Sequence, residues 1–182
     1  MITTPLSEQD TTLLDRAVAL AQKGLFTTKP NPRVGCVIAR EGKIIGEGWH
    51  VRAGQVHAEI AALIAADHDV RGADVFVSLE PCSHHGKTGP CATALIDAGV
   101  ARVVISMLDP NPEVSGRGVE MLRQAGIQVL ISDNPEQARM INSGFCLRME
   151  KGRPLVRLKI AATLDGRTAA SDGSSQWITG DS

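Results

Sequence analysis

Aromatic side chains are scarce in this chain of 182 residues, because tyrosine is absent and phenylalanine and tryptophan together make up only 3%. A surplus of positive charge is lacking as well, since 19 Lys and Arg residues stand against 20 Asp and Glu residues and the formal net charge is -1. Proteins that bind nucleic acids usually combine a basic surface with aromatic rings on which bases stack. The composition therefore argues against a nucleic-acid partner and favours a small-molecule substrate.

Long apolar runs are also missing from the chain. No stretch approaches the roughly 18 apolar residues that a membrane-spanning helix needs, and residues 1–7 lack the basic and apolar segments of a secretory signal. We therefore expect a soluble, cytoplasmic protein without a membrane partner. The chain has only four cysteines, and in a cytoplasmic protein clustered Cys and His residues more often bind metal or perform chemistry than form disulfides.

What the chain does contain is an alternation of helix and strand patterns. Hydrophobic periodicity and turn residues predict helices over residues 8–23, 58–66, 92–98, 118–125 and 135–151, and strands over 34–39, 43–49, 73–79, 102–107, 127–131 and 155–161. This order predicts an α/β fold with a mixed sheet and helices on both faces. Gly152 and Pro154 mark a connector. We therefore expect one domain over residues 1–150, followed by a connector and the start of another over 151–182.

Three metal ligands and one carboxylate stand out in the middle of the chain. His57-Ala58-Glu59 is followed by Pro81-Cys82 and then by Cys91. One imidazole and two thiolates can hold zinc while leaving a fourth position open to water, and a free carboxylate beside that water can transfer its protons. His-x-Glu followed by Pro-Cys and a second Cys is the arrangement of zinc-dependent nucleobase deaminases, in which the Glu is not a ligand. We therefore expect zinc on His57, Cys82 and Cys91, with Glu59 transferring protons.

The two cysteines are separated by eight residues, 83–90, and this loop is basic and contains glycine. Its His84 and Lys87 suit an anion such as a phosphate group, because lysine binds phosphate as a point charge and an imidazole can add a hydrogen bond. A solvated loop whose charges have no function is the alternative.

Four further positions have a functional and a structural interpretation. Asp109 and Asn111 follow a strand at the end where ligands of such sheets bind, although a Pro-rich turn would look the same. The amide of Asn31, between two prolines, could bind the edge of a pyrimidine or simply form a turn. His50 is either a site residue or an ordinary histidine at a strand end. Cys36 lies in an apolar run and is expected in the core.

Two rival hypotheses remain open for the zinc site. A closed structural site would take His50, His84 or His85 as a fourth ligand and leave Glu59 in solvent, as in a non-catalytic, zinc-stabilised interaction domain. A deaminase of tRNA or of another nucleobase would share the zinc chemistry. It predicts a shorter cysteine spacing and, for tRNA, a basic surface, and neither is evident here.

Taken together, the segments at residues 31–35, 46–50, 57–59, 80–91 and 109–112 resemble the bifunctional riboflavin-biosynthesis deaminase/reductase family. The eight-residue spacing is specific, since cytidine, guanine and tRNA adenosine deaminases use shorter ones. The resemblance implies a cytidine-deaminase-like three-layer fold with about five strands. It also implies hydrolysis of 2,5-diamino-6-(5-phosphoribosylamino)pyrimidin-4(3H)-one to 5-amino-6-(5-phosphoribosylamino)uracil and ammonia.

The same resemblance implies roles for single residues. Zinc would be held by His57, Cys82 and Cys91, and Glu59 would be catalytic. The positions that match the substrate site of the family are Asn31, His50, His84, Lys87, Asp109 and Asn111.

The last part of the chain, residues 158–168 and 174–180, resembles the opening of the family's NADPH-dependent reductase domain. Ala161 and Trp177 match cofactor-contacting positions there, and Ser175 matches a substrate-contacting one. Such a domain needs on the order of 100 further residues to bury its core. We therefore expect NADPH binding only with a complete reductase domain, the chain being a fragment of the bifunctional enzyme or a deaminase with a vestigial tail. The sequence leaves a homo-oligomer open as a partner.

Overall fold

A computed structural model describes residues 5–83, 89–112 and 114–175 of the chain. The helices in these ranges are α1 (Glu8–Gln22), α2 (Ala58–Ala65), α3 (Cys91–Ala98), α4 (Arg117–Gln124), α5 (Glu136–Ile141) and α6 (Ser143–Lys151), and the strands are β1 (Gly35–Arg40), β2 (Lys43–Trp49), β3 (Asp74–Val77), β4 (Arg102–Ile105) and β5 (Gln128–Ile131). None of the helices in the described ranges is long and apolar enough to cross a membrane.

The strands form one mixed sheet in the order β2-β1-β3-β4-β5. Strands β3, β4 and β5 run parallel to one another, whereas β1 is antiparallel to both of its neighbours. Antiparallel β1 and β2 are joined by a short turn, and the parallel strands are joined by helices, as such connections require. The expected mixed sheet of about five strands is confirmed.

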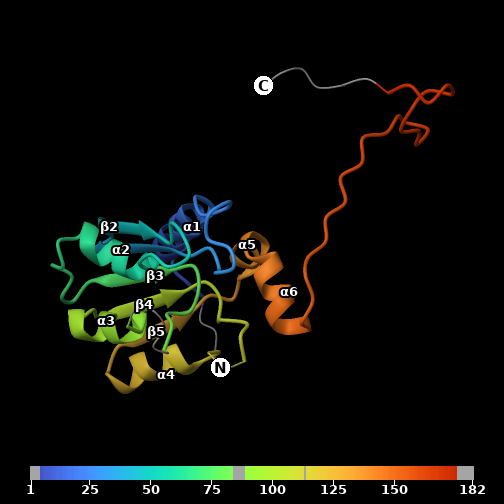
Figure 1. The fold of residues 1–182 in the computed structure, drawn as a ribbon. Coiled ribbons are helices and arrows are strands. Elements are labelled where there is room, and N and C mark those ends of the chain that lie inside the picture. Colours follow the sequence, from blue (N-terminus) through green and yellow to red (C-terminus); the bar gives the residue numbers. More distant parts are fainter. Residues whose placement is uncertain (1–4, 84–88, 113, 176–182) are drawn as a thin grey trace.

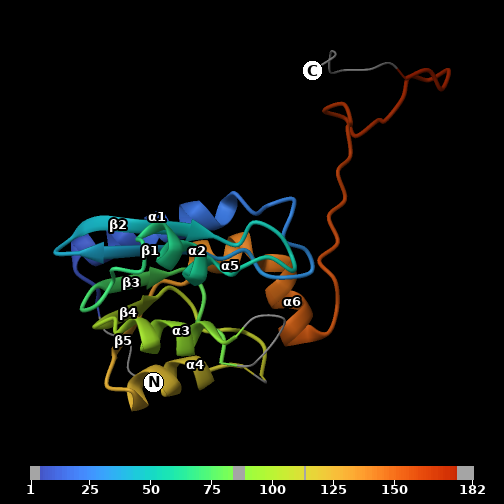
Figure 2. The same ribbon diagram turned by 60° about the vertical axis from the view of Figure 1, so that its left-hand side comes forward.

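Helices cover both faces of this sheet (Figures 1 and 2). Along β4, the side chains of Val103 and Ile105 pack in the cluster with α2, α3 and α4, whereas Val104 packs in the cluster with α1. This alternation follows from the two-residue period of a strand, and both faces are apolar because both are covered. Helix α5 packs on α1 and α6 packs on α5, and the three helices share a third cluster through Val18, Ala138 and Cys146. The three-layer arrangement expected from the sequence is confirmed.

Two glycines in β2 allow α2 to lie unusually close to the sheet. A Cβ atom at Gly46 would come within 2.5 Å of the Ala62 carbonyl oxygen, and one at Gly48 would come within 2.5 Å of the Ala58 carbonyl oxygen. Any larger residue there would push α2 off the strand. These contacts position the first turn of α2 above the sheet.

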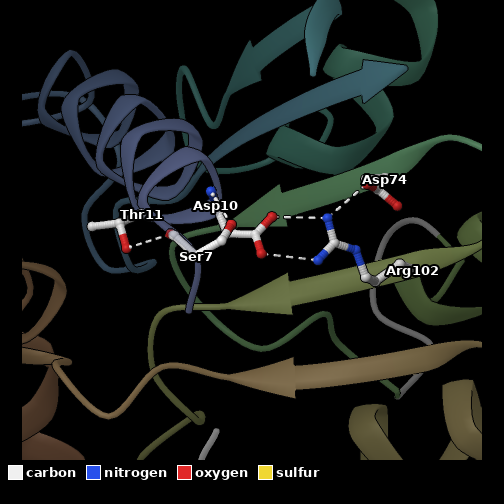
Figure 3. Close-up of polar contacts among 5 residues, drawn as sticks. All are labelled: Ser7, Asp10, Thr11, Asp74 and Arg102. Carbon is white, nitrogen blue, oxygen red and sulfur yellow. Dashed lines mark hydrogen bonds and ion pairs between the residues drawn. The ribbon is translucent and has the colours of Figure 1, made fainter. Parts of the chain in front are cut away.

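A network of charges ties the start of α1 to the amino ends of β3 and β4. The Ser7 hydroxyl caps α1 by accepting a hydrogen bond from the Asp10 backbone N–H at 3.1 Å. The Asp10 carboxylate binds Arg102 at 2.8 and 3.0 Å, and Arg102 also binds Asp74 at 2.7 Å. Figure 3 shows the guanidinium between the two carboxylates. Asp10, Asp74 and Arg102 are called the Arg102 cluster below.

The helix predicted over residues 135–151 is two helices, α5 and α6, which meet at Asn142. The Asn142 side chain binds the backbone of Arg33: its Oδ1 accepts from the Arg33 N–H at 2.8 Å, and its Nδ2 donates to the Arg33 carbonyl at 2.9 Å. Asn142 is only 2% exposed. A tertiary contact of this kind outweighs the local preference for a continuous helix.

The strand predicted over residues 155–161 was wrong. After Gly152 the chain leaves the body of the domain and runs as an exposed segment (Figures 1 and 2). Val156 and Leu158 are 81% and 83% exposed. A strand needs a neighbour for its backbone N–H and C=O groups, and no strand of the described residues lies beside this segment. The division into two domains at residue 150 stays a prediction.

Candidate metal and catalytic site

A cavity of about 500 Å³ lies past the carboxyl ends of β3 and β4. The residues that line it are Pro30, Asn31, Pro32, Val34, His50, Ala53, Gly54, Gln55, His57, Glu59, Leu79, Glu80, Cys82, Asp109, Asn111, Val114 and Phe145. They come from distant parts of the chain, because the strand ends, the start of α2 and the start of α6 meet here. The position agrees with the rule that ligands of such sheets bind outside the carboxyl ends of the strands.

The three predicted metal ligands meet at this cavity. His57 precedes the first residue of α2, Cys91 is the first residue of α3, and Cys82 follows β3. Nδ1 of His57 lies 3.6 Å from Sγ of Cys82 and 3.3 Å from Sγ of Cys91, and all three ligand atoms lie within 4.8 Å of one another. A tetrahedral zinc ion separates a sulfur and a nitrogen ligand by about 3.6 Å. The donor set and its spacing therefore fit zinc.

The two thiols have pKa values shifted in opposite directions. The hydrogen bond with Cys91 lowers the pKa of Cys82 to about 4, with further help from His57 and the Cys91 backbone N–H. The same hydrogen bond, together with burial, raises the pKa of Cys91. The hydrogen bond with Cys82 also raises the pKa of His57. A bound divalent cation displaces these protons and leaves two thiolates and a neutral imidazole as ligands.

Glu59 lies in the first turn of α2 and is only 3% exposed. Burial, with a smaller contribution from the neighbouring Cys82, raises its pKa to about 7. Among the described residues, the group of atoms that could hold a metal consists of His57, Cys82 and Cys91, without Glu59. A carboxyl group of this pKa beside a metal site can accept and return a proton near neutral pH. The catalytic role of Glu59 stays a prediction, and its buried position on the cavity wall is consistent with it.

His50 lines the cavity but does not act as a fourth ligand. Its Nδ1 lies 3.0 Å from the Val56 carbonyl oxygen and its Nε2 lies 3.2 Å from Nδ2 of Asn31. Both ring nitrogens are therefore engaged, with Nδ1–H donating and Nε2 accepting. Burial lowers the pKa of His50, which agrees with this neutral form. Its ring meets that of His57 edge-on, with the centroids 5.4 Å apart. Instead, the hydrogen bond from Asn31 to His50 holds the Asn31 side chain at the cavity wall.

Two of the other predicted positions, Asp109 and Asn111, lie at the cavity, whereas Cys36 lies in the core. Asp109 and Asn111 line the cavity, and the Asn111 N–H donates to Oδ1 of Asp109 at 2.8 Å, so the segment is a turn as well as part of the site wall. Cys36 is fully buried in the core and outside the ligand group, as expected.

Of five further predicted positions, three lie outside the described residues and two do not line the cavity. His84, Lys87 and Trp177 lie outside the described residues. Ala161 and Ser175 lie in the exposed segment after α6 and do not line the cavity. The roles of all five stay predictions. His85, the remaining rival fourth ligand, also lies outside the described residues.

Gln55, Glu80 and Phe145 are among the residues of the cavity wall that sequence reasoning missed. No local signal pointed to Gln55, in the loop before α2, or to Phe145, on α6. Glu80 did carry a signal, since it is a charged residue directly after the strand predicted over residues 73–79 and directly before Pro81.

Known proteins share both the sequence and the fold. Residues 7–107 match the family model described as the cytidine and deoxycytidylate deaminase zinc-binding region. The riboflavin biosynthesis protein RibD of Escherichia coli (strain K12) is 57% identical over 171 residues, which are 94% of this chain and 47% of that protein. The expected cytidine-deaminase-like fold agrees with this match.

Two solved structures show the same relationship. Acinetobacter baumannii RibD, form 1, has a TM-score of 0.89 and 51% identity over 95% of this chain and 49% of that one. The diaminohydroxyphosphoribosylaminopyrimidine deaminase/5-amino-6-(5-phosphoribosylamino)uracil reductase from Thermotoga maritima has a TM-score of 0.89 and 46% identity over 94% of this chain and 50% of that one. The chain thus spans about half the length of the relatives it matches. It belongs to the family of the cytidine and deoxycytidylate deaminase zinc-binding region, and over that half it is similar to the RibD proteins.

Proposed function

We propose that this chain is a zinc-dependent deaminase of riboflavin biosynthesis. Its substrate would be 2,5-diamino-6-(5-phosphoribosylamino)pyrimidin-4(3H)-one, and its products 5-amino-6-(5-phosphoribosylamino)uracil and ammonia. The observation that carries the reaction class is the buried Glu59 carboxyl beside His57, Cys82 and Cys91, the group among the described residues that could hold a metal. Three protein ligands would leave a fourth position for water. The choice of substrate is supported by the name of the Thermotoga maritima relative and by the basic loop between the cysteines.

In this mechanism Glu59 carries the protons. When bound, zinc supplies a Lewis acid that makes a water molecule acidic enough to lose its proton near neutral pH. Glu59 accepts that proton as the water oxygen forms its bond to the amine-bearing ring carbon, and then passes it to a ring nitrogen. A second transfer through Glu59 protonates the amine, the carbon–nitrogen bond breaks and ammonia leaves. Its pKa of about 7 suits Glu59 to both directions of transfer.

The walls of the cavity would hold the pyrimidine against this centre. The hydrogen bond between Asn31 and His50 orients the Asn31 amide so that its oxygen can accept a hydrogen bond from the ring. Asp109 and Asn111 face the cavity from the other loop, and Phe145 supplies an apolar ring surface. These contacts select a flat heterocycle, and the proposal gives Ala161, Ser175 and Trp177 no part in deamination.

An ammonia-release assay on the zinc-loaded chain tests the proposal. We expect turnover of the phosphoribosyl diaminopyrimidine and none of cytidine or adenosine, which lack the second ring amine and the phosphate group on the ribose. Preferred turnover of cytidine, or of adenosine in tRNA, would assign the chain to another deaminase. A chain that binds zinc through four protein ligands and releases no ammonia would be a zinc-stabilised interaction domain instead.

The phosphate contact has its own test, which rests on the basic loop between the cysteines. We expect Lys87→Ala to raise KM for the phosphorylated substrate about tenfold, as loss of a charged hydrogen bond does, and to leave zinc content and KM for a dephosphorylated analogue unchanged. Lys43→Ala, at the exposed start of β2, is the matched control and should change neither constant. An equal loss on both substrates would argue against a phosphate contact.

A further inference from the structure

The buried carboxylate of Glu80 takes no part in the deamination chemistry. Glu80 is 3% exposed, and it lies on the cavity wall directly before Pro81. One of its oxygens accepts backbone N–H bonds from Asp109 at 3.2 Å and Gly116 at 2.9 Å, and the other accepts from Gly118 at 2.9 Å and Val119 at 3.3 Å. Loss of this buried carboxylate would cost free energy, because each of the four backbone N–H donors would be left without its hydrogen-bond acceptor.

All four donors belong to one segment, which connects β4 to α4 and includes the first turn of α4. The residue before α4 is Gly116, so the helix has no side-chain cap of its own. Glu80 therefore occupies the place of a capping side chain, where negative charge also suits the helix dipole. The Glu80 backbone N–H donates to the Met107 carbonyl at 3.0 Å. Glu80 thus holds the segment near both of its ends.

Steric contact holds the same segment from a second direction. A Cβ atom at Gly118 would lie 2.0 Å from the Pro81 carbonyl oxygen and 3.3 Å from Oε1 of Glu80. The start of α4 is therefore pressed against the turn that leads to Cys82. The start of α4 and the turn before Cys82 therefore cannot move far independently of each other.

The segment that Glu80 holds also carries residues of the cavity wall. Asp109, Asn111 and Val114 line the cavity together with Cys82. We propose that Glu80 is a positioning residue that keeps this wall in place relative to the zinc ligands, a proposal that rests on the proposed function for its choice of substrate. His57 and Glu59 lie at the start of α2, the first as its N-cap and the second in its first turn, and Glu80 does not contact them through these bonds. Loss of the Glu80 carboxylate therefore weakens substrate binding more than the chemical step.

The test is Glu80→Gln, which keeps the shape of the side chain and turns one acceptor oxygen into an N–H donor that faces two backbone N–H groups. We expect KM for the phosphoribosyl pyrimidine to rise about tenfold and kcat to stay within about threefold. Zinc content should be unchanged, and hydrogen exchange at the amides of Asp109, Gly116, Gly118 and Val119 should become faster. Glu80→Asp keeps both acceptor oxygens, and the same changes should appear at a smaller size.

A matched control separates positioning from general stability. Ser7→Ala removes the cap of α1, at the amino ends of the strands, and should lower stability without changing KM or the exchange of these amides. An unchanged KM in Glu80→Gln overturns the proposal. Loss of zinc also overturns it, because Glu80 would then be needed to hold the turn that carries the zinc ligand Cys82. If Glu80→Gln does not fold, Glu80→Asp decides by the same criteria, and failure of both to fold shows a purely structural role. An inactive wild-type chain counts against the proposed function, and the exchange result then decides the role of Glu80.

Discussion

The two ends of the parallel strands β3 and β4 arrange polar groups in opposite ways. At the amino ends, the guanidinium of Arg102 is paired with the carboxylates of Asp10 and Asp74, so that opposite charges are in contact (Figure 3). At the carboxyl ends, two thiols, an imidazole and the buried Glu59 gather around the ligand position. The first cluster is complete as it stands, whereas the second is complete only with a cation.

The pKa values of the two clusters show the same difference. Burial by itself would raise the pKa of Asp10, but its hydrogen bonds with Arg102 and Ser7 lower it overall, so the group stays charged. Burial raises the pKa of Glu59 to about 7, and no pairing of this kind reverses it. A group kept charged contributes stability, whereas a group kept near pH 7 can exchange protons. The contrast separates a stabilising cluster from a reactive one.

Removal of zinc should have the largest effect, and only at the carboxyl ends. We expect a chelator to abolish ammonia release and to lower the free energy of unfolding by about 3 kcal/mol or more, because a ligand that binds only the folded state stabilises it. Added zinc should restore ammonia release and the free energy of unfolding in the wild type, and neither of them in Cys82→Ser. Atomic absorption, activity and urea denaturation measure these changes. Full activity in the zinc-free chain would contradict the conclusion that the cluster at the carboxyl ends is complete only with a cation.

Glu59→Gln should have the next largest effect. The amide keeps the shape of the side chain but cannot accept a proton, so we expect kcat to fall by about 10³-fold with zinc content unchanged. The matched control is Glu120→Gln, which changes an exposed carboxyl group on α4 and should leave kcat as it is. An active Glu59→Gln variant would show that Glu59 is only a buried carboxyl group like those of ordinary cores.

Arg102→Met should affect stability and leave catalysis intact. It leaves Asp10 and Asp74 near each other without their cation, in a partly buried position, and we expect the free energy of unfolding to fall by about 2 kcal/mol. The kcat and KM of the folded enzyme should match those of the wild type. Arg40→Met, which removes an exposed pair with Asp69, should change little. A lower kcat in Arg102→Met would mean that the two ends of the sheet are coupled.

The reactive cluster was predictable from the sequence to a larger extent than the rest. His57, Glu59, Cys82 and Cys91 could be identified because their residue types define the chemistry and because each lies at the start of a helix or the end of a strand, which local patterns reveal. Their meeting within 4.8 Å agrees with that prediction for the three ligands.

The features that could not be predicted depend on distant partners. The break between α5 and α6 is caused by a bond between Asn142 and Arg33, which are 109 positions apart. The predicted strand over residues 155–161 was wrong because its alternating apolar residues satisfied the local pattern, while strand formation also needs a neighbour. Arg102 looked like any charged residue at a strand start, since its two partners come from other elements.

The smallest predicted effect is the dependence of the Arg102 cluster on acid pH. The pKa of Asp10 in the folded state lies below its ordinary value of 3.8, so its contribution to stability is present above that value and is lost as the pH falls through the lowered one. The difference in unfolding free energy between the wild type and Arg102→Met should therefore be constant from pH 5 to 6 and shrink below about pH 4. Urea denaturation at a series of pH values measures it. A difference that stays constant down to pH 2 would mean that Arg102 stabilises the fold by packing against Phe76, over whose ring it lies at 5.7 Å, and not by holding Asp10 charged.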